Sequence, residues 1–297
     1  MTIKSVLQFL ESIAPSIYQE SYDNAGLIVG YPSTEITGVL CCLDATEAVV
    51  DEAINKNCNL IVAHHPIVFK GLKRFNGKNY VERVVMKAIK NDIAIYAIHT
   101  NLDNMLYQGV NTRIAERLGL KNTRILAPKS DLKKLIAFAD ESAINQLKHQ
   151  LFEIGVGTNH TLKNNSYVSL AATTIGGQGK AKVKLELLFP SALQRQVISL
   201  LNQFQTSSSF SYQVHAIENS NHQIGSGMMG ELPRAMSEKA FFNYLKEQMQ
   251  VTCIKHTQLS GKTIKKVAFC GGAGGFLLRK AIGALSLIHI SEPTRPY

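Results

Sequence analysis

Hydrophobic and polar positions along the first 127 residues follow two periods, one typical of helices and one typical of buried strands. Apolar residues recur at helical spacing in four segments, which predicts helices at 3–14, from about 46, at 80–90 and at 108–119. Short continuous apolar runs predict strands at 36–43, 58–63 and 92–98. Strands separated by helices of this length are typical of β-α-β units, so we expect a mainly parallel sheet in an α/β domain.

The pattern changes in the middle of the chain. Strands are predicted at 134–139, 166–175, 182–189 and 210–218, and helices at 141–155 and 191–204. The order β-α-β-β-α-β is that of a ferredoxin-like unit. We therefore expect a ferredoxin-like α+β domain that is inserted into the α/β domain.

The α/β pattern then resumes with a helix at 237–249, a strand at 265–270, a Gly-rich loop and the first turns of another helix. The last residues, LSLIHISEPTRPY, lack periodicity, supply no strand after that helix and resemble translated sequencing-adapter sequence. We expect the C-terminal part of the α/β domain to be missing. The predicted organisation is a first α/β metal-binding part at 1–128, the ferredoxin-like insertion at 129–232, an incomplete second α/β part at 233–284, and a spurious or disordered tail at 285–297.

The composition is that of a globular protein, with 45% hydrophobic and 18% charged residues, and it leaves ample material for a core. No apolar run approaches the roughly 20 residues that a membrane-spanning helix needs. The N-terminal segment has helical spacing interrupted by Glu11 and does not read as a signal peptide. We therefore expect a cytoplasmic protein without a membrane partner.

The chain has five cysteines, an odd number, and none forms a CxxC pair. Three of them lie in apolar, strand-like runs, which favours buried, reduced, structural cysteines.

The net charge of +10 raises the alternative of a nucleic-acid or anionic partner. The basic residues are scattered, with small clusters at Lys70–Arg74 and Lys262–Lys266, and neither cluster is interleaved with aromatic residues. This pattern favours a solvated basic surface over a nucleic-acid interface.

Residues of the kind that bind metals follow three successive predicted strands. Asp44 ends the first, the pair His64 and His65 ends the second, and His99 and Asp103 follow the third. In a parallel sheet the carboxyl ends of neighbouring strands meet at one edge, where ligands bind. The sequence therefore predicts a site at this edge.

The histidine doublet needs a second observation, because such pairs are more often ordinary surface or loop residues. Neighbouring side chains on an extended segment point apart, and Pro66 keeps His65 extended. The two rings could therefore serve two different metal ions roughly 3.5–4 Å apart. Asp103 at the neighbouring strand end could supply an oxygen ligand, and this combination favours a metal site.

A Gly-rich loop forms a second candidate site between the strand at 265–270 and the following helix. Its glycines are Gly271, Gly272, Gly274 and Gly275. Such a loop can present backbone N–H groups to a phosphate, and it can equally be a tight strand–helix turn. The sequence leaves both interpretations open.

Several motifs together resemble one family. The segments SYDNAGLIVG (21–30), LDAT (43–46), IVAHHPIVFKG (61–71) and IHTNLDN (98–104) are similar to those of the dinuclear-metal, hexameric proteins known as type 2 GTP cyclohydrolase I homologues. IGSGMMGEL (224–232) and VAFCGGAGGFLL (267–278) fit the same family, as does the predicted insertion, which marks its long bacterial form. The resemblance covers roughly residues 1–284.

The resemblance implies two divalent metal ions, whose identity could be zinc, iron, manganese, cobalt or nickel. His64 and His65 would each bind one ion, and Asp103 would join His65. A water molecule between the ions would be the nucleophile. Further residues would orient ligands or line the pocket, namely His99, Asp23, Asn24 and Asp44.

The function implied is that of a metal-dependent hydrolase acting on a nucleotide-like or phosphorylated small molecule, in a homohexamer. A non-catalytic metal-binding scaffold or regulator is the first alternative, and a nucleic-acid-binding protein is the second. Chains of this family continue past the Gly-rich loop to a late His and, four residues on, a Glu that bridges the metals. We expect this chain, which lacks them, to be inactive.

Overall fold

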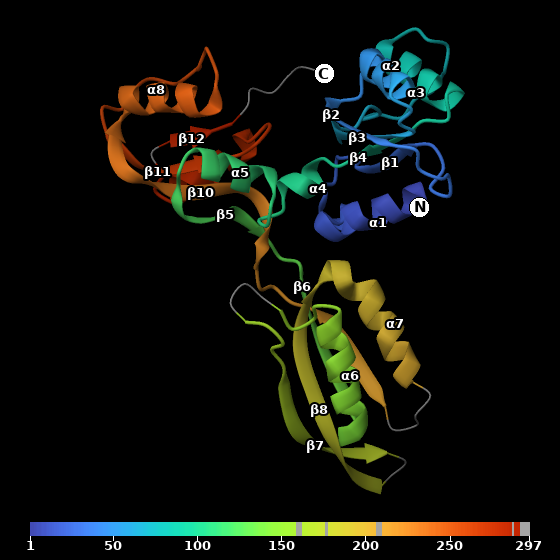
Figure 1. The fold of residues 1–297 in the computed structure, drawn as a ribbon. Helices are drawn as coiled ribbons and strands as arrows, with labels where there is room; N and C mark the ends of the chain where they lie inside the picture. The colour runs from blue at the N-terminus through green and yellow to red at the C-terminus, as the bar shows by residue number, and fades with distance from the viewer. Residues whose placement is uncertain (159–161, 176–177, 206–209, 287, 292–297) are drawn as a thin grey trace.

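A computed structural model shows three parts, each built around its own four-stranded sheet (Figure 1). It describes residues 1–158, 162–175, 178–205, 210–286 and 288–291. We refer to residues 1–105 as the N-terminal lobe, to 106–129 with 221–291 as the C-terminal lobe, and to 132–216 as the inserted unit. None of the helices in these residues is long and apolar enough to cross a membrane.

The sheet of the N-terminal lobe has the strand order β1-β4-β3-β2. Its strands are β1 (Gly26–Val29), β2 (Val39–Asp44), β3 (Leu60–His65) and β4 (Ala94–Ala97). Strands β2, β3 and β4 pair in parallel, as the sequence pattern predicted, and β1 adds an antiparallel edge that it did not predict.

Both faces of this sheet are buried, which explains the continuous apolar run of β3. Helix α1 (Ile3–Ile13) packs against Leu60 and Val62 on one face. Helices α2 (Glu47–Asn55) and α3 (Tyr80–Lys90) cover Ile61 and Ala63 on the other face. Successive strand residues point to opposite faces, so the apolar residues of this run are buried alternately in one core and in the other.

The sheet of the C-terminal lobe has the order β12-β11-β10-β5 and is mainly antiparallel. Its strands are β5 (Lys121–Lys129), β10 (Asn221–Ser237), β11 (Thr263–Phe269) and β12 (Ile288–Ile290). Helices α5 (Val110–Arg117) and α8 (Glu238–Met249) share one core with β10 and β11, and α9 (Leu278–Gly283) packs on the other face. The short helix α4 (Thr100–Asp103) lies between the two lobes (Figure 1).

The expectation of a single, mainly parallel sheet is therefore wrong for this lobe. Strands β5 and β10 were not predicted, and they run across the predicted domain boundaries at 128 and 232. Glycines and Pro233 made β10 read as a loop. The close pairing requires glycine, since a Cβ on Gly225 would lie 2.2 Å from the carbonyl oxygen of Ala127.

The tail predicted at 285–297 contains a strand, contrary to the sequence pattern. Residues Ile288–Ile290 form β12 and pair in parallel with Val267–Phe269 of β11. Two apolar isoleucines alternate with His289, which is enough for a short strand beside a buried neighbour. Residues 292–297 of the predicted tail lie outside the described residues.

The inserted unit has the predicted element order β-α-β-β-α-β. Its elements are β6 (Leu132–Ala139), α6 (Glu141–Glu153), β7 (Tyr167–Ile175), β8 (Gln178–Pro190), α7 (Gln194–Phe204) and β9 (Ser211–Ala216). The strands lie in the order β7-β8-β6-β9, and every neighbouring pair is antiparallel. Both helices pack on one face, where they form a core separate from those of the lobes.

All five cysteines lie in described residues and are free thiols. The expectation of burial is wrong for Cys41 and Cys253, which are exposed. Cys41 lies on β2, and the edge position of that strand leaves part of it open to solvent.

The two lobes meet at the carboxylate of Glu20, which follows the short 3₁₀ helix η1 (Ser16–Tyr18). Its Oε1 accepts hydrogen bonds from Lys129 Nζ at 2.9 Å, Asn104 Nδ2 at 2.7 Å and Ser226 Oγ at 3.2 Å. Burial alone would raise the pKa of Glu20, but the bonds from Lys129 and Asn104 outweigh it and hold the pKa below its usual value.

Replacing Leu147 by Ala should destabilise the inserted unit by about 2–5 kcal/mol, because Leu147 of α6 is fully buried in its core. Urea unfolding followed by circular dichroism measures the loss. Leu170→Ala in the same unit is the control, since Leu170 is 85% exposed and should change stability by less than about 0.5 kcal/mol. Equal losses in the two variants would contradict the assignment of the core.

Glu20→Gln should lower the free energy of unfolding by about 1–3 kcal/mol at pH 7, because it removes a charged acceptor of three hydrogen bonds. The folded-state pKa is lowered, so this stabilisation is present above the unfolded pKa near 4.3 and is lost as the pH falls. The free energies of unfolding of wild type and variant should therefore converge as the pH falls from about 5 to about 3. Glu52→Gln is the control. Glu52 forms an exposed pair with Lys56, so this variant should differ little from wild type in free energy of unfolding at either pH.

Candidate metal centre

The parallel register of the N-terminal lobe brings the predicted ligands together. Asp44 is the register partner of His65, and Ala63 is the partner of Ala97. His64 and His65 therefore lie level with the residues that follow β4, including His99. The ladder of β3 ends here because Pro66 has no backbone N–H to donate.

Three histidine side chains form the centre of the site. His64, His65 and His99 each offer a ring nitrogen, and these nitrogens all lie within 4.8 Å of one another. The ring centroids are 4.9 Å apart for His64 and His65, 5.3 Å for His64 and His99, and 5.5 Å for His65 and His99. This grouping could hold a metal ion.

The ring of His64 is fixed by the backbone of the neighbouring strand end. Its Nδ1 donates a hydrogen bond to the carbonyl oxygen of Ile98 at 2.9 Å, because that carbonyl can only accept. Burial lowers the pKa of His64 to about 4, and the charges of His99 and His65 act in the same direction. His64 is therefore neutral at pH 7, and its Nε2 carries a free lone pair.

Carboxylates fix the other two rings through their Nδ1 atoms. Asp44 Oδ1 lies 2.8 Å from Nδ1 of His65, and Asp23 Oδ1 lies 2.7 Å from Nδ1 of His99. A carboxylate can only accept, so each Nδ1 carries the proton. All three imidazoles thus have Nδ1 engaged and Nε2 left as the metal-binding atom.

The carboxylate of Asp23 is fully buried and is held by several donors. Besides His99, it accepts from the backbone N–H of Thr100 at 3.0 Å, from the Thr100 hydroxyl, and from the N–H of Asn24 at 2.7 Å. Burial acts to raise the pKa of Asp23, but the hydrogen bonds from His99 and Thr100 outweigh it and lower the pKa to about 2. Asp23 is therefore an anion at every physiological pH.

The donor set fits a divalent transition metal. Neutral imidazole nitrogens suit zinc, iron, copper and nickel, and ligand histidines ordinarily donate their other ring N–H to a carboxylate or a backbone carbonyl. All three partners of that kind are present here. Asp103 adds an oxygen next to the cluster, with Oδ1 3.8 Å from Nε2 of His64.

The structure shows where the residues named by the resemblance lie, while their roles toward a metal ion stay predictions. His99, expected to line the pocket, has its ring in the histidine group itself. Asp103 lies near His64, and its expected sharing of an ion with His65 stays a prediction. Asp23 has a buried side chain that accepts a hydrogen bond from His99. Asp44 holds His65, and Asn24 donates to the carbonyl of Val68 at 2.6 Å.

The Gly-rich loop does not contribute to the histidine group, but one buried side chain joins it to α4. Asn111 accepts from the N–H of Gly271 at 2.9 Å and donates to the backbone carbonyl of Asp103 at 3.0 Å. Sequence reasoning missed Asn111, because an Asn in a polar helix carries no distinctive signal. Anion binding by the predicted set Gly271, Gly272, Gly274 and Gly275 stays a prediction.

Fold and site together define a mixed α/β protein with several sheets and a three-histidine group able to hold a metal ion. The family model described as Duf34/NIF3 (NGG1p interacting factor 3) matches residues 1–286. The chain belongs to this family, which confirms the resemblance found in its motifs.

Relatives and solved structures agree with this assignment. A Bacillus subtilis (strain 168) protein named GTP cyclohydrolase 1 type 2 homolog is 31% identical over 94% of this chain and 79% of that protein. The crystal structure of a Bacillus cereus protein related to NIF3 is similar at a TM-score of 0.86 and 30% identity, covering 99% of this chain and 83% of that chain. A Staphylococcus aureus crystal structure has a TM-score of 0.77 and 27% identity, covering 100% of this chain and 82% of that chain.

Asp23→Asn should weaken divalent-metal affinity about 10–100-fold, because an amide neither carries the charge that holds His99 nor fixes its tautomer. Titration with Co²⁺ by calorimetry measures the change. Asp51→Asn, an equally conservative change on α2 at an exposed pair with Lys87, should leave the affinity unchanged. Identical affinities for the two variants would show that Asp23 does not support the site.

Proposed function

We propose that this protein is a metal-dependent hydrolase acting on a nucleotide-like or phosphorylated small molecule. The observation that carries the proposal is that His64, His65 and His99 each bring one ring nitrogen to within 4.8 Å of the others, while their Nδ1 atoms are all engaged by acceptors and leave Nε2 available for a metal. The name of the Bacillus subtilis relative supports the nucleotide-like substrate class.

In this proposal His64 and His65 each hold one of two divalent ions, and His99 and Asp103 complete the donor set. Bound divalent metal would lower the pKa of water and polarise the bond to be cleaved. The chain's own contribution is orientation. Asp23 and Asp44 hold two imidazoles in one tautomer, and the carbonyl of Ile98 holds the third, so little reorganisation is needed when an ion and a substrate enter.

The proposal extends to the architecture. The inserted unit, residues 132–216, would be a ferredoxin-like domain inserted into the metal-binding domain, supported by the strand order β7-β8-β6-β9 with both helices on one face. The assembly would be a homohexamer, as the family resemblance implies. Light scattering coupled to size-exclusion chromatography tests this, and a monodisperse monomer would count against it.

A metal-binding scaffold or regulator is the second candidate. The observation that favours it is the inserted unit, which has a core of its own and contributes none of the three histidines. Metal-loaded full-length protein, including the late His and Glu of the family, that turns over no member of a broad panel of nucleotides and phosphate esters would support this candidate over the hydrolase.

His64→Ala and His99→Ala should each lower Co²⁺ affinity at least tenfold and abolish any metal-dependent release of phosphate from the same panel. His149→Ala is the matched control, because this histidine is 77% exposed on α6 in the inserted unit. Calorimetry reports binding, and a phosphate-release assay reports turnover. Turnover that survives both histidine variants would refute the hydrolase assignment at this site.

A further inference from the structure

An aromatic pair, the exposed Tyr22 and the half-buried Phe69, lies beside the metal centre. Tyr22 immediately precedes Asp23, the buried partner of His99, and Phe69 follows His65 by four residues. The two ring centroids are 6.4 Å apart and the rings are inclined by 46°. Tyr22 is 60% exposed, although the side chain of its neighbour Asp23 is completely buried. A large ring is thus held at the surface next to the candidate reaction centre.

The two segments that carry these rings are tied together. Asn24 Nδ2 donates to the carbonyl oxygen of Val68 at 2.6 Å, and the N–H of Ala25 donates to Gln19 Oε1 at 2.8 Å. The bond between Asn24 and Val68 lies next to the ring pair along both segments. A surface fixed in this way loses little conformational entropy when a ligand binds.

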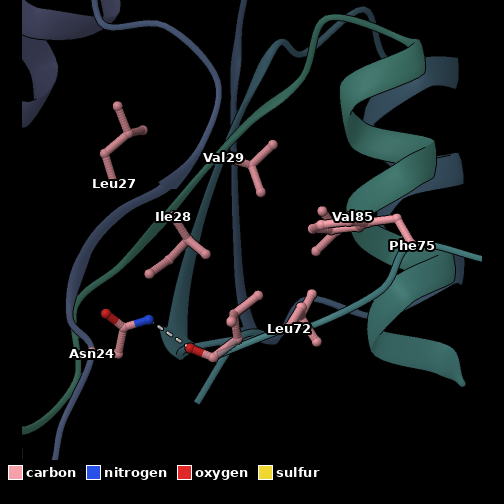
Figure 2. A pocket seen from close by; sticks show the side chains of 8 residues that line it. Asn24, Leu27, Ile28, Val29, Leu72, Phe75 and Val85 are labelled. Atoms are coloured by element: carbon pink, nitrogen blue, oxygen red, sulfur yellow. Dashed lines mark hydrogen bonds between the residues drawn. The ribbon is translucent and has the colours of Figure 1, made fainter. Parts of the chain in front are cut away.

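A cavity of about 290 Å³ adjoins the segments that carry the ring pair, sharing Asn24 and Val68 with them, and its other lining residues are apolar (Figure 2). Asn24 lies at one end of it, with its amide directed to Val68. Its walls come from β1, from the connection between β3 and α3, and from α3. Among the lining residues are Ile28, Val29, Leu72, Phe75 and Val85. This volume is at the lower end of the range for small-molecule sites, so it suits one ring system.

The connection between β3 and α3 also carries three exposed cations, Lys70, Lys73 and Arg74. Lys73 and Arg74 lie in sequence between Leu72 and Phe75, which line the cavity. The nearby ion pairs of the described residues join Arg83 to Glu47 and Lys87 to Asp51, and they leave these three cations out. Positive charge concentrated at a concave site attracts anions.

We propose that Tyr22, Phe69 and the β3–α3 connection form the substrate-binding surface of the metal centre, and that they recognise a small anion carrying a flat aromatic ring. The ring would stack on Tyr22 and Phe69 and enter the cavity, and the anionic group would be bound by Lys70, Lys73 and Arg74. This inference rests on the proposed hydrolase function and specifies its substrate class. A single short connection with a cavity for one ring fits a small molecule better than a nucleic-acid strand, which needs a longer basic track.

The test compares three probes on the full, Co²⁺-loaded chain by calorimetry. GTP carries both a ring and an anion, tripolyphosphate carries the anion alone, and guanosine carries the ring alone. GTP should bind at least tenfold more tightly than either of the others. Tyr22→Leu and Phe69→Leu should each weaken GTP binding about tenfold and leave tripolyphosphate binding unchanged, because they remove only the stacking surface.

The variant Lys70→Gln/Lys73→Gln/Arg74→Gln should weaken GTP and tripolyphosphate alike and reduce the dependence of both affinities on salt. Two controls match these changes. Tyr31→Leu removes an aromatic ring that is 76% exposed away from the centre, and Lys239→Gln/Lys246→Gln/Lys255→Gln removes three exposed charges from the C-terminal lobe. Neither control should alter GTP affinity, and Co²⁺ affinity should be unchanged in all five variants.

Several outcomes would overturn the proposal. They are equal affinity for GTP and tripolyphosphate, no detectable GTP binding by protein that binds Co²⁺, or GTP binding that is indifferent to Tyr22→Leu. A single-stranded oligonucleotide that binds more than tenfold tighter than GTP would overturn it in favour of nucleic acid. If Co²⁺ does not bind but the affinity for GTP still falls in Tyr22→Leu, the hydrolase proposal fails while the proposal of a ring-binding surface stands.

Discussion

The parallel register of β2, β3 and β4 is the constraint on which the metal centre depends. It sets Asp44 opposite His65 and places the end of β4 level with the histidine pair. A slip of one residue would exchange the faces to which His64 and His65 point and would also turn Leu60 and Ile61 toward the wrong cores. Because both faces of the sheet are buried, the packing of apolar side chains fixes the geometry of the polar site.

A second constraint is the buried anion beneath His99. A carboxylate removed from water is costly unless donors surround it, and Asp23 receives hydrogen bonds from His99, Asn24 and Thr100. The Thr100 hydroxyl also accepts from the N–H of Glu20 at 2.8 Å. One short segment therefore serves the histidine group and the contact between the lobes at the same time.

The sequence predicted those parts of the molecule whose signal is local. The apolar run of β3 and its ending in His64, His65 and Pro66 were readable from residue types alone, as were the helices of the inserted unit. Strands β5 and β10 were not, because their pairing is long-range and their glycines and Pro233 have the composition of loops.

The candidate site follows the same division. Strand-end reasoning found His64, His65, His99, Asp44 and Asp103, but a sequence cannot show which nitrogen of a ring faces a partner. The position of His99 within the group depends on Asp23, which lies 76 residues earlier in the chain. Long-range hydrogen bonds of this kind leave no periodic trace in a sequence.

The attachment of the inserted unit has a consequence for how the chain could be shortened. Lys129, where the chain leaves the C-terminal lobe, and Asn221, where it returns, are register partners in the antiparallel ladder of β5 and β10. The roughly 90 residues between them thus occupy the position of a hairpin turn. A tight two-residue turn could replace them without breaking a strand pair, because antiparallel neighbours can be joined that closely. The inserted unit thus occupies the position of a loop between β5 and β10. A chain shortened in this way would still contain every strand of both lobes.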